Sequence, residues 1–577
     1  MTYDNLYWSG TLAEYVALLK RKVYQYKRAH ERVYSAIQDA LKNPTFDTRL
    51  IGMDEMIEKI MTNYFLPASR RYDIRKRLLI LIGPPGSGKS SFVRFIKRAL
   101  EAYSYKKEGA IFKIKHCPLN EDPLLALPLE ERVTLYNETG IRVDGFLSPL
   151  NQLKLMNDYD GNWRNIEVER FFINEAKRSG IGTFFPTDPY NQDISDLIGA
   201  VDFSKLTTYG SPSDPRAYRY DGEFQVANQG LLELHELFKS ETRLLYPFLT
   251  LAEENTYKIS RQQMIYTDQV VIGHSNVEDF EQFSQRKNEA LLNRMQLVRF
   301  PYTLKLNDEV KIYQSKFVNG DEKKFATFSL EAAAAFAILT RLKRTKKPFT
   351  LLEKMDIYNG EDELARKELL TENSEEGMNG LDPRLIFDRL SIIASNHETI
   401  DGRTVLNNLK QMLTEDMRIN AEHIDRYEYV LQLTEKYYYN RWETLIFKVL
   451  KRRFQKEIEQ LFQSYVEQFN EQTTLVKEIN RKVGIDEDND DHFSHALKQL
   501  FNKNMQREMT FEDAPDNLIE ALSIFVIKQK LNEIIKRYDL TNWINTDLAD
   551  ELAKSEIKLE KNETKTYEKI LKHFLNK

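Results

Sequence analysis

Apolar residues follow two different spacings along the 577-residue chain. In residues 1–50 they recur every three or four positions, as at Leu12, Tyr15 and Leu19, which predicts amphipathic helices. Between residues 51 and 305 the spacing changes to short apolar runs separated by helical segments. The expected strands are Leu78–Ile82, Ile111–Ile114, Gly230–His235, Val270–His274 and Leu297–Phe300. Strands that alternate with helices predict an α/β domain, in which a parallel sheet has helices on both faces.

From about residue 323 the helical spacing returns. The expected helices include Phe328–Lys343, Pro383–Ala394, Tyr427–Leu461 and Leu518–Tyr538. Four parts are therefore predicted: an N-terminal helical segment (1–50), an α/β domain (51–305), a helical lid (306–400) and a helical C-terminal domain (401–577).

The composition limits the cellular compartment and the binding partners that we expect for this protein. Lys and Arg number 83 against 88 Asp and Glu, so the net charge of −5 gives no overall basic surface for nucleic acid. A single cysteine, Cys117, excludes an internal disulfide framework and is typical of a reducing compartment. The N-terminus lacks the features of a signal peptide, and no apolar run is long enough to span a bilayer. We therefore expect a cytoplasmic protein that does not act at a membrane.

A complete phosphate-binding loop follows the first expected strand. Residues 83–90 read Gly-Pro-Pro-Gly-Ser-Gly-Lys-Ser, which matches GxxxxGK[ST] and leads into a helix. Glycines let backbone N–H groups converge on phosphate oxygens, and the helix N-terminus adds its positive dipole. We expect Lys89 to contact the β- and γ-phosphates of ATP and Ser90 to ligate Mg²⁺. The predicted nucleotide-binding residues of the loop are Gly83, Pro84, Pro85, Gly86, Ser87, Gly88, Lys89, Ser90 and Ser91.

A second, acidic strand is needed to position the metal and the attacking water. The candidate, Gly230–Glu236, reads Gly-Leu-Leu-Glu-Leu-His-Glu and resembles the Walker B region of helix-insert AAA+ ATPases. The resemblance assigns Glu236 to the glutamate that polarises water, while His235 replaces the usual adjacent aspartate. Glu233 lies on the same strand face as His235 and is a candidate metal ligand in compensation. A charge at the sheet edge is the alternative role for Glu233.

Three further segments resemble AAA+ motifs in their order and spacing. Val270–Asn276 is similar to the sensor-1 strand, so Asn276 is expected near the γ-phosphate, although capping the next helix is its alternative role. Glu289–Met295 resembles the segment with an arginine finger, which makes Arg294 a candidate to act on a neighbouring subunit's nucleotide. A solvated helix arginine is the alternative. Arg384, at a predicted helix start, resembles sensor 2 and is expected to bind the nucleotide.

Over residues 8 to about 390 the sequence resembles the PrkA family of AAA+ proteins, known as serine protein kinases. The segments that carry the resemblance are Trp8–Tyr15, Ala29–Tyr34, Pro84–Ser90, Gly182–Phe184, Asp188–Ser195, Tyr209–Arg216, Tyr220–Glu223 and Glu289–Arg294. The resemblance implies an AAA+ P-loop ATPase module with a helical lid and a helical C-terminal region credited with Ser/Thr phosphorylation. It also implies ATP and Mg²⁺ as cofactors, a protein substrate, and a homo-oligomer such as a hexameric ring.

No motif of the protein kinase fold supports phosphorylation independently. The sequence has no GxGxxG loop, no Val-Ala-Ile-Lys strand, no His-Arg-Asp and no Asp-Phe-Gly. The expected function is therefore ATP hydrolysis coupled to action on a protein substrate, with serine phosphorylation implied by the family. ATP-dependent protein remodelling or proteolysis is one alternative, and a nucleotide-switched regulatory scaffold is the other.

Overall fold

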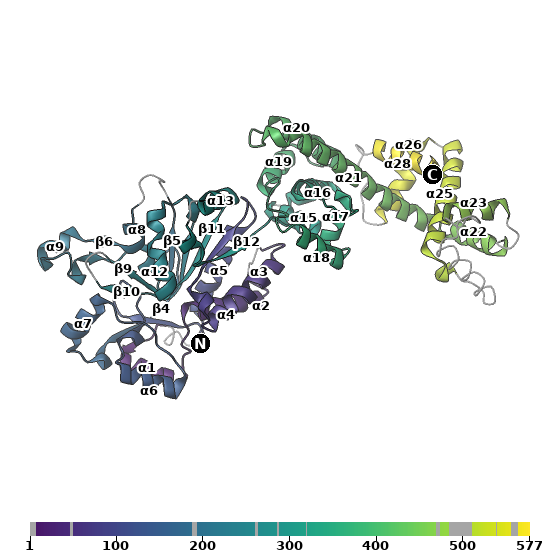
Figure 1. The fold of residues 1–577 in the computed structure, drawn as a ribbon. Helices are drawn as coiled ribbons and strands as arrows, with labels where there is room; N and C mark the ends of the chain where they lie inside the picture. Colours follow the sequence, from purple (N-terminus) through teal and green to yellow (C-terminus); the bar gives the residue numbers. More distant parts are fainter. Residues whose placement is uncertain are drawn as a thin grey trace. The chain divides into compact units, whose positions relative to one another are not determined.

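The computed structural model describes residues 7–46, 50–186, 193–259, 263–285, 288–318, 320–468, 473–483, 511–537, 539–554 and 564–576. The chain divides into two compact units, Met1–Leu304 with Lys367–Pro383 and Lys305–Arg366 with Arg384–Lys577. Figure 1 traces the chain through both units, from purple at the N-terminus to yellow at the C-terminus. The division into four parts stays a prediction. Within the described residues, no helix is long and apolar enough to cross a membrane.

The first unit is built around a five-stranded parallel sheet. Its strands, in spatial order, are β12 (Met295–Arg299), β2 (Leu78–Ile82), β11 (Val270–Ser275), β8 (Leu231–Leu234) and β5 (Ile181–Phe184). All five residues of β2 are buried Leu or Ile, as expected for a strand covered on both faces. The predicted α/β class with a parallel sheet is confirmed.

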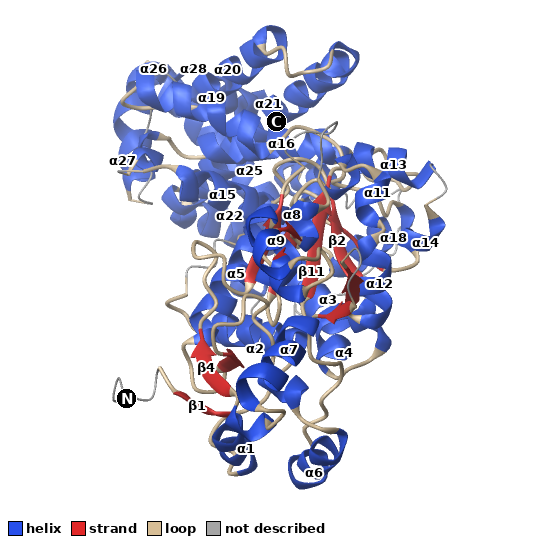
Figure 2. Cartoon of the chain, turned by 90° about the vertical axis from the view of Figure 1, so that its left-hand side faces the viewer, coloured by secondary structure: helices blue, strands red, loops and turns tan. Residues whose placement is uncertain are grey.

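Helices cover both faces of this sheet, as Figure 2 shows for the strands around β2 and β11. Alternate residues of β2 divide between two hydrophobic clusters, because successive side chains of a strand point to opposite faces. Leu79 and Leu81 pack with α2 (Ala29–Lys42), α3 (Asp54–Ile60) and α5 (Lys89–Ser104). The opposite face packs with α10 (Glu223–Val226), α11 (Thr242–Leu245), α12 (Pro247–Glu254), α13 (Val277–Gln285) and α14 (Glu289–Leu292).

One expected strand belongs to a different sheet. Ile111–Ile114 forms β3, which pairs antiparallel with β4 (Glu167–Phe171) in a three-stranded sheet completed by β1 (Ser9–Thr11). The fifth central strand is β5 instead, a four-residue segment that contains Gly182. A Cβ atom on Gly182 would lie 2.6 Å from the backbone oxygen of Glu223, so close packing requires the glycine.

Short elements connect these layers. They are α1 (Leu12–Lys20), α4 (Leu66–Ser69), α6 (Leu129–Thr139), α7 (Pro149–Tyr159), α8 (Ser195–Ile198), β6 (Ala200–Val201), α9 (Phe203–Tyr209), β7 (Tyr218–Arg219), β9 (Thr256–Lys258) and β10 (Met264–Tyr266). The described part of segment 186–222 includes two short α-helices and a two-stranded antiparallel sheet. Residues 188–192 of the family-like segment Asp188–Ser195 lie outside the described residues.

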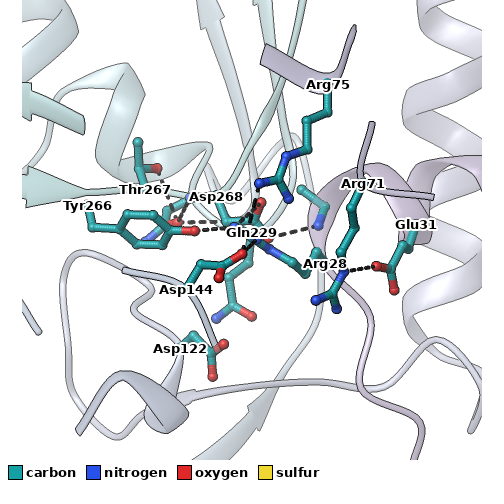
Figure 3. A network of polar contacts seen from close by, with 12 residues as sticks. Arg28, Glu31, Arg71, Arg75, Asp122, Asp144, Gln229, Tyr266, Thr267 and Asp268 are labelled. Atoms are coloured by element: carbon teal, nitrogen blue, oxygen red, sulfur yellow. Dashed lines mark hydrogen bonds and ion pairs between the residues drawn. The ribbon is translucent and has the colours of Figure 1, made fainter. Parts of the chain in front are cut away.

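A network of buried and half-buried charged groups docks the start of α2 against the central sheet (Figure 3). The guanidinium of Arg28 donates to Asp144 at 2.7 Å and pairs with Asp268 at 3.5 Å, while the Ala29 N–H donates to Asp268 at 2.9 Å. Burial acts to raise the pKa of Asp268, but the charge of Arg28 and the Ala29 hydrogen bond outweigh it and lower this pKa. Asp268 precedes β11 by two residues, so α2 docks at the amino edge of the sheet.

The second unit is helical. Its central helix is α16 (Ser329–Arg341), which packs against α15 (Leu306–Lys316), α17 (Leu351–Asn359), α20 (Gly402–Glu415) and α21 (Ile424–Arg453). Arg341 and Glu309 form a fully buried bidentate ion pair across α15 and α16, at 2.7 and 2.9 Å. The other helices are α18 (Glu363–Glu372), whose residues are divided between the two units, α19 (Pro383–Asn396), α22 (Gln455–Gln468), α23 (Thr474–Val483), α25 (Asp516–Arg537), α26 (Leu540–Trp543), α27 (Ala549–Ala553) and α28 (Thr564–Asn576). The predicted helical C-terminal region is confirmed.

Candidate nucleotide-binding site

The phosphate-binding loop lies where the sequence predicts it, between β2 and α5. Gly86 and Gly88 have φ angles of +75° and +97°, a conformation that favours glycine, and Gly88 immediately precedes α5. Strand β2 lies between β11 and β12, which both come later in the chain. The loop therefore leaves the sheet at a topological switch point, where ligands of α/β sheets usually bind.

The ammonium group of Lys89 is held against the loop. Nζ donates to the carbonyl oxygens of Gly83 and Pro84 at 2.6 and 2.7 Å, and it lies 3.4 Å from Ser87 Oγ. Lys89 is buried, whereas Ser90 and Ser91 in the first turn of α5 are exposed. A buried cation at a glycine-rich helix start is the expected arrangement for binding phosphate, and the exposed Ser90 hydroxyl is accessible to Mg²⁺.

Neighbouring segments leave no room for side chains on the loop. A Cβ atom on Gly83 would lie 2.0 Å from the backbone oxygen of Phe300, and one on Gly86 would lie 2.1 Å from a carboxylate oxygen of Asp382. The hydroxyl of Tyr302 donates to the Pro85 carbonyl at 2.7 Å. The loop conformation is thus fixed by contacts with Phe300 and Tyr302, which follow β12, and with Asp382 of the same unit.

Asn276 lies directly beside the start of the loop. It follows β11, whose last residue, Ser275, accepts a hydrogen bond from the Gly83 N–H at 3.3 Å. The Asn276 side-chain oxygen accepts from the Asp279 N–H at 2.7 Å, which caps α13. The capping role is therefore present, and the sensor role stays a prediction that this position favours.

Glu236 lies past the end of β8 in a left-handed conformation, with a φ of +45°. Its carboxylate accepts from Lys239 at 2.7 Å and its side chain is 55% exposed. Lys239 also lies 4.0 Å from Asp279 on the first turn of α13, so the segments that follow β8 and β11 meet here. Glu236 and Asn276 are brought to the same edge of the sheet as the phosphate-binding loop, and an exposed carboxylate at this edge can accept a proton from water.

Glu233 has a different environment from Glu236. It is buried, and its carboxylate accepts from Lys97 Nζ at 2.6 Å, while His235 Nε2 and His274 Nε2 lie at 3.1 and 3.3 Å. Burial acts to raise the pKa of Glu233, but the two imidazole hydrogen bonds and the charge of Lys97 outweigh it, so this pKa lies well below its usual range. Glu233 is therefore not a charge at an exposed edge. Its role as a ligand of Mg²⁺ stays a prediction.

Arg294 lies at the opposite edge of the sheet from the loop. It immediately precedes β12, and its carbonyl accepts from the N–H of Leu78 at the start of β2. Strand β2 has five residues, so about 16 Å of strand separates this edge from the loop. The Arg294 guanidinium donates to the Ala290 carbonyl at 2.6 Å and pairs with Glu253. This placement does not allow contact with the nucleotide of the same subunit.

Arg384 belongs to the second compact unit. It is the second residue of α19, after Pro383, as predicted for a helix start. Its contact with the nucleotide stays a prediction.

Two residues near the loop were not predicted from the sequence. Lys97 and His274 complete the surroundings of Glu233, but they come from α5 and β11, which lie far from Glu233 in sequence. The sequence contained a partial signal for these contacts. Glu233 and His235 are two positions apart and so share one strand face, and Lys97 follows Lys89 by about two turns of helix.

These features together define the class of the first unit. A parallel sheet with helices on both faces, a complete phosphate-binding loop after β2 and polar residues after β8 and β11 are those of a P-loop nucleotide-binding domain. The sequence comparisons identify the family. Residues 10–348 match the PrkA AAA domain and residues 352–511 match the PrkA serine protein kinase C-terminal domain, so the chain belongs to the PrkA family. The family resemblance is confirmed, and an AAA domain binds nucleotide.

Two similar proteins carry different functional names. The "ATP-dependent protease PrkA" of Bacillus subtilis (strain 168) is 34% identical, over 96% of this chain and 96% of its own length. The "Serine/threonine kinase YeaG" of Escherichia coli (strain K12) is 31% identical, over 66% of this chain and 64% of its own length. Among solved structures, NtrX from Brucella abortus matches 69% of this chain and 70% of its own, at 11% identity and a TM-score of 0.26.

Proposed function

We propose that this protein hydrolyses ATP at the phosphate-binding loop and uses the energy to act on a protein substrate. The observation that carries the proposal is the loop itself. Gly86 and Gly88 adopt positive φ angles, and the buried Lys89 ammonium lies at the start of α5. A fixed cation and converging N–H groups are what the β- and γ-phosphates of ATP require.

Each residue at this edge of the sheet has a role in the proposal. Lys89 binds the terminal phosphates, and the exposed Ser90 hydroxyl holds Mg²⁺, which neutralises charge on those phosphates. Glu236 orients the attacking water and accepts its proton, because its carboxylate is solvent-accessible and paired only with Lys239 in the described contacts. Asn276 hydrogen-bonds on the γ-phosphate side while it caps α13.

In the proposed mechanism, a neighbouring subunit supplies an arginine to the nucleotide site. Arg294 cannot reach the nucleotide of its own subunit, because it lies at the amino edge of the sheet. In a homo-oligomer, with a hexameric ring as the proposed form, the same arginine from the adjacent subunit stabilises charge on the transferred phosphate. Arg384 acts as sensor 2 and binds the nucleotide in this scheme.

Two outputs of ATP hydrolysis are candidates. The protease-named relative aligns with 96% of this chain, whereas the kinase-named relative aligns with 66%. The more complete alignment includes the second unit, and the sequence contains one P-loop and no kinase-fold motif. These observations favour ATP-dependent remodelling or proteolysis over phosphorylation. The match of residues 352–511 to a domain named for serine kinase activity keeps phosphorylation as the second candidate.

A single assay separates the two outputs. The full chain is incubated with casein and γ-labelled ATP, and the casein is analysed both for incorporated label and for fragments. Fragments that require ATP, without label, support proteolysis, while label on serine supports phosphorylation. ATP consumption with neither product supports remodelling. A protein that consumes no ATP in the presence of Mg²⁺ and casein contradicts the proposed function.

A further inference from the structure

Three potential metal ligands meet on one face of the central sheet, next to the P-loop strand. They are Glu233, His235 and His274, each of which offers one ligand atom, and these three atoms lie within 4.8 Å of one another. Glu233 Oε1 is 3.1 Å from the His235 nitrogen and 3.3 Å from the His274 nitrogen. The three side chains come from β8, from the residue after it and from β11, which are adjacent parallel strands and their ends.

We infer that Glu233, His235 and His274 bind a divalent transition-metal ion such as Zn²⁺. A tetrahedral Zn²⁺ site has metal–ligand bonds of about 2.0–2.1 Å, which places ligand atoms about 3.3–3.4 Å apart. The two measured separations are close to this value. An ion can therefore enter between the three atoms with small side-chain movements, and one coordination position remains for water.

Neighbouring groups hold the ligands in orientations that suit a metal. Lys97 Nζ donates to Glu233 Oε2 at 2.6 Å, which leaves Oε1 directed at the two imidazoles. The ring of His235 stacks on Phe185 with centroids 3.8 Å apart, and it meets the His274 ring edge-on at 4.5 Å. The Lys97 hydrogen bond and the Phe185 contact thus fix the orientations of two of the three ligands, as hydrogen-bonded outer groups do at metal sites.

The donor set distinguishes this site from one for Mg²⁺. Two imidazole nitrogens and one carboxylate suit Zn²⁺, Co²⁺ and other transition metals, whereas Mg²⁺ prefers oxygen ligands in octahedral geometry. Access is available through His235, whose side chain is 19% exposed while those of Glu233 and His274 are buried. The inferred ion is thus additional to the Mg²⁺ that accompanies ATP.

A bound ion would tie together the strand ends that surround the nucleotide. His274 lies opposite Leu81 of β2, two residues before the phosphate-binding loop begins at Gly83. An ion shared by β8 and β11 would fix the spacing of these strands beside the loop. We therefore expect metal binding to stabilise the folded first unit, since a ligand that binds only the native state raises its stability.

The test measures metal binding in the absence of nucleotide. The full chain is stripped with a chelator, equilibrated with Zn²⁺, passed through a desalting column and analysed for metal content. Co²⁺ is bound in parallel, because tetrahedral Co²⁺ absorbs visible light far more strongly than octahedral Co²⁺. We expect about one Zn²⁺ per chain at this site, the tetrahedral Co²⁺ spectrum, and a rise in melting temperature with Zn²⁺.

Matched histidine variants locate the ion. His235→Ala and His274→Asn should each lower Zn²⁺ affinity at least about 10-fold and abolish the Co²⁺ spectrum. His397→Ala, which removes an exposed imidazole of the second unit, should behave as the unsubstituted chain. Thermal melting in the presence of chelator shows whether each variant is folded. If the buried His274→Asn variant is unstable, the variant at the partly exposed His235 still tests the inference.

Three results would overturn the inference. They are no retained Zn²⁺, equal Zn²⁺ binding and an equal Co²⁺ spectrum in the folded His235→Ala protein, or displacement of the ion by excess Mg²⁺. Because no nucleotide is present, failure here leaves the proposed ATPase function intact, and an inactive ATPase leaves the metal inference intact.

Discussion

At the scale of single residues, Glu233 and Glu236 show how the fold separates two similar side chains. They are three positions apart, yet Glu233 is 2% exposed and Glu236 is 55% exposed. A buried carboxylate requires compensation, which Lys97 and two histidines supply to Glu233. Glu236 has the solvent access that a group must have to accept a proton from water.

The contrast predicts different effects of the same substitution. Glu236→Gln should leave ATP binding unchanged and reduce hydrolysis by about 100-fold or more, because it keeps the shape of the side chain and removes the base. Glu233→Gln should mainly lower thermal stability, because Lys97 loses its buried partner. Steady-state ATPase rates, nucleotide binding and melting curves check both. Normal turnover in Glu236→Gln with loss of turnover in a folded Glu233→Gln protein would show that the roles are exchanged.

The sequence predicted local features of the site better than distant ones. The phosphate-binding loop is contiguous, so its residues and its strand-to-helix setting could be read directly from residues 78–96. The contacts of Glu233 could not, because Lys97 and His274 are 136 and 41 positions away. Only the order of strands in the sheet brings them together.

At the scale of secondary structure elements, distant contacts also determine which strands belong to the central sheet. Ile111–Ile114 and β5 are both four residues long, and the more apolar of the two was expected in the central sheet. In the structure β5 occupies this position instead, because it pairs in parallel with β8, while Ile111–Ile114 pairs with β4. Short runs indicate that a strand exists, but the partner depends on contacts that the local sequence does not contain.

The docking of α2 predicts a pH-dependent stability. Burial lowers the pKa of His30, on the first turn of α2, from 6.5 to about 4. Between these values the unfolded chain binds one proton more at His30 than the folded chain. The free energy of unfolding should therefore fall as the pH falls, by about 1.4 kcal/mol per pH unit from this group.

Denaturant unfolding at several pH values measures this effect. His30→Gln should show a shallower loss of stability than the unsubstituted chain between pH 6.5 and about 4. His423→Gln, at an exposed histidine of the second unit, serves as the control and should leave the slope unchanged. Equal slopes for all three proteins would contradict a buried neutral His30.

If Arg294, between α14 and β12, acts on a neighbouring subunit's nucleotide, ATP hydrolysis requires contact between subunits. Arg294→Ala and Lys89→Ala should each be inactive alone, because each lacks one half of every interface site. Mixed in equal amounts, they should regain activity, since about a quarter of randomly formed interfaces join an intact Lys89 to an intact Arg294. ATPase rates of the separate and mixed proteins measure this.

Two controls accompany the mixing experiment. Arg164→Ala removes another partly exposed arginine and should keep normal activity. Glu253→Gln frees Arg294 from its ion pair and should not abolish hydrolysis. Full activity of Arg294→Ala alone, or turnover that is independent of protein concentration in a monomer, would contradict the proposed finger.

At the scale of the whole molecule, the phosphate-binding machinery and the bulk of the helical region belong to different compact units. The loop, Asn276 and Glu236 are all in the first unit, whereas residues 401–577 of the second contain no further nucleotide-binding motif in the sequence. Any ATP-dependent action of the second unit on a protein should therefore depend on the loop in the first.

The most direct test of this account is the ATP affinity and hydrolysis rate of the Lys89→Ala protein. The substitution removes the one loop side chain whose cation lies against Gly83 and Pro84. We predict about 100-fold weaker ATP binding and no measurable hydrolysis, with an unchanged melting temperature in the absence of nucleotide. Lys106→Ala, which removes an exposed lysine paired with Asp39, should keep both activities. ATP hydrolysis by Lys89→Ala at the rate of the unsubstituted chain would contradict the account.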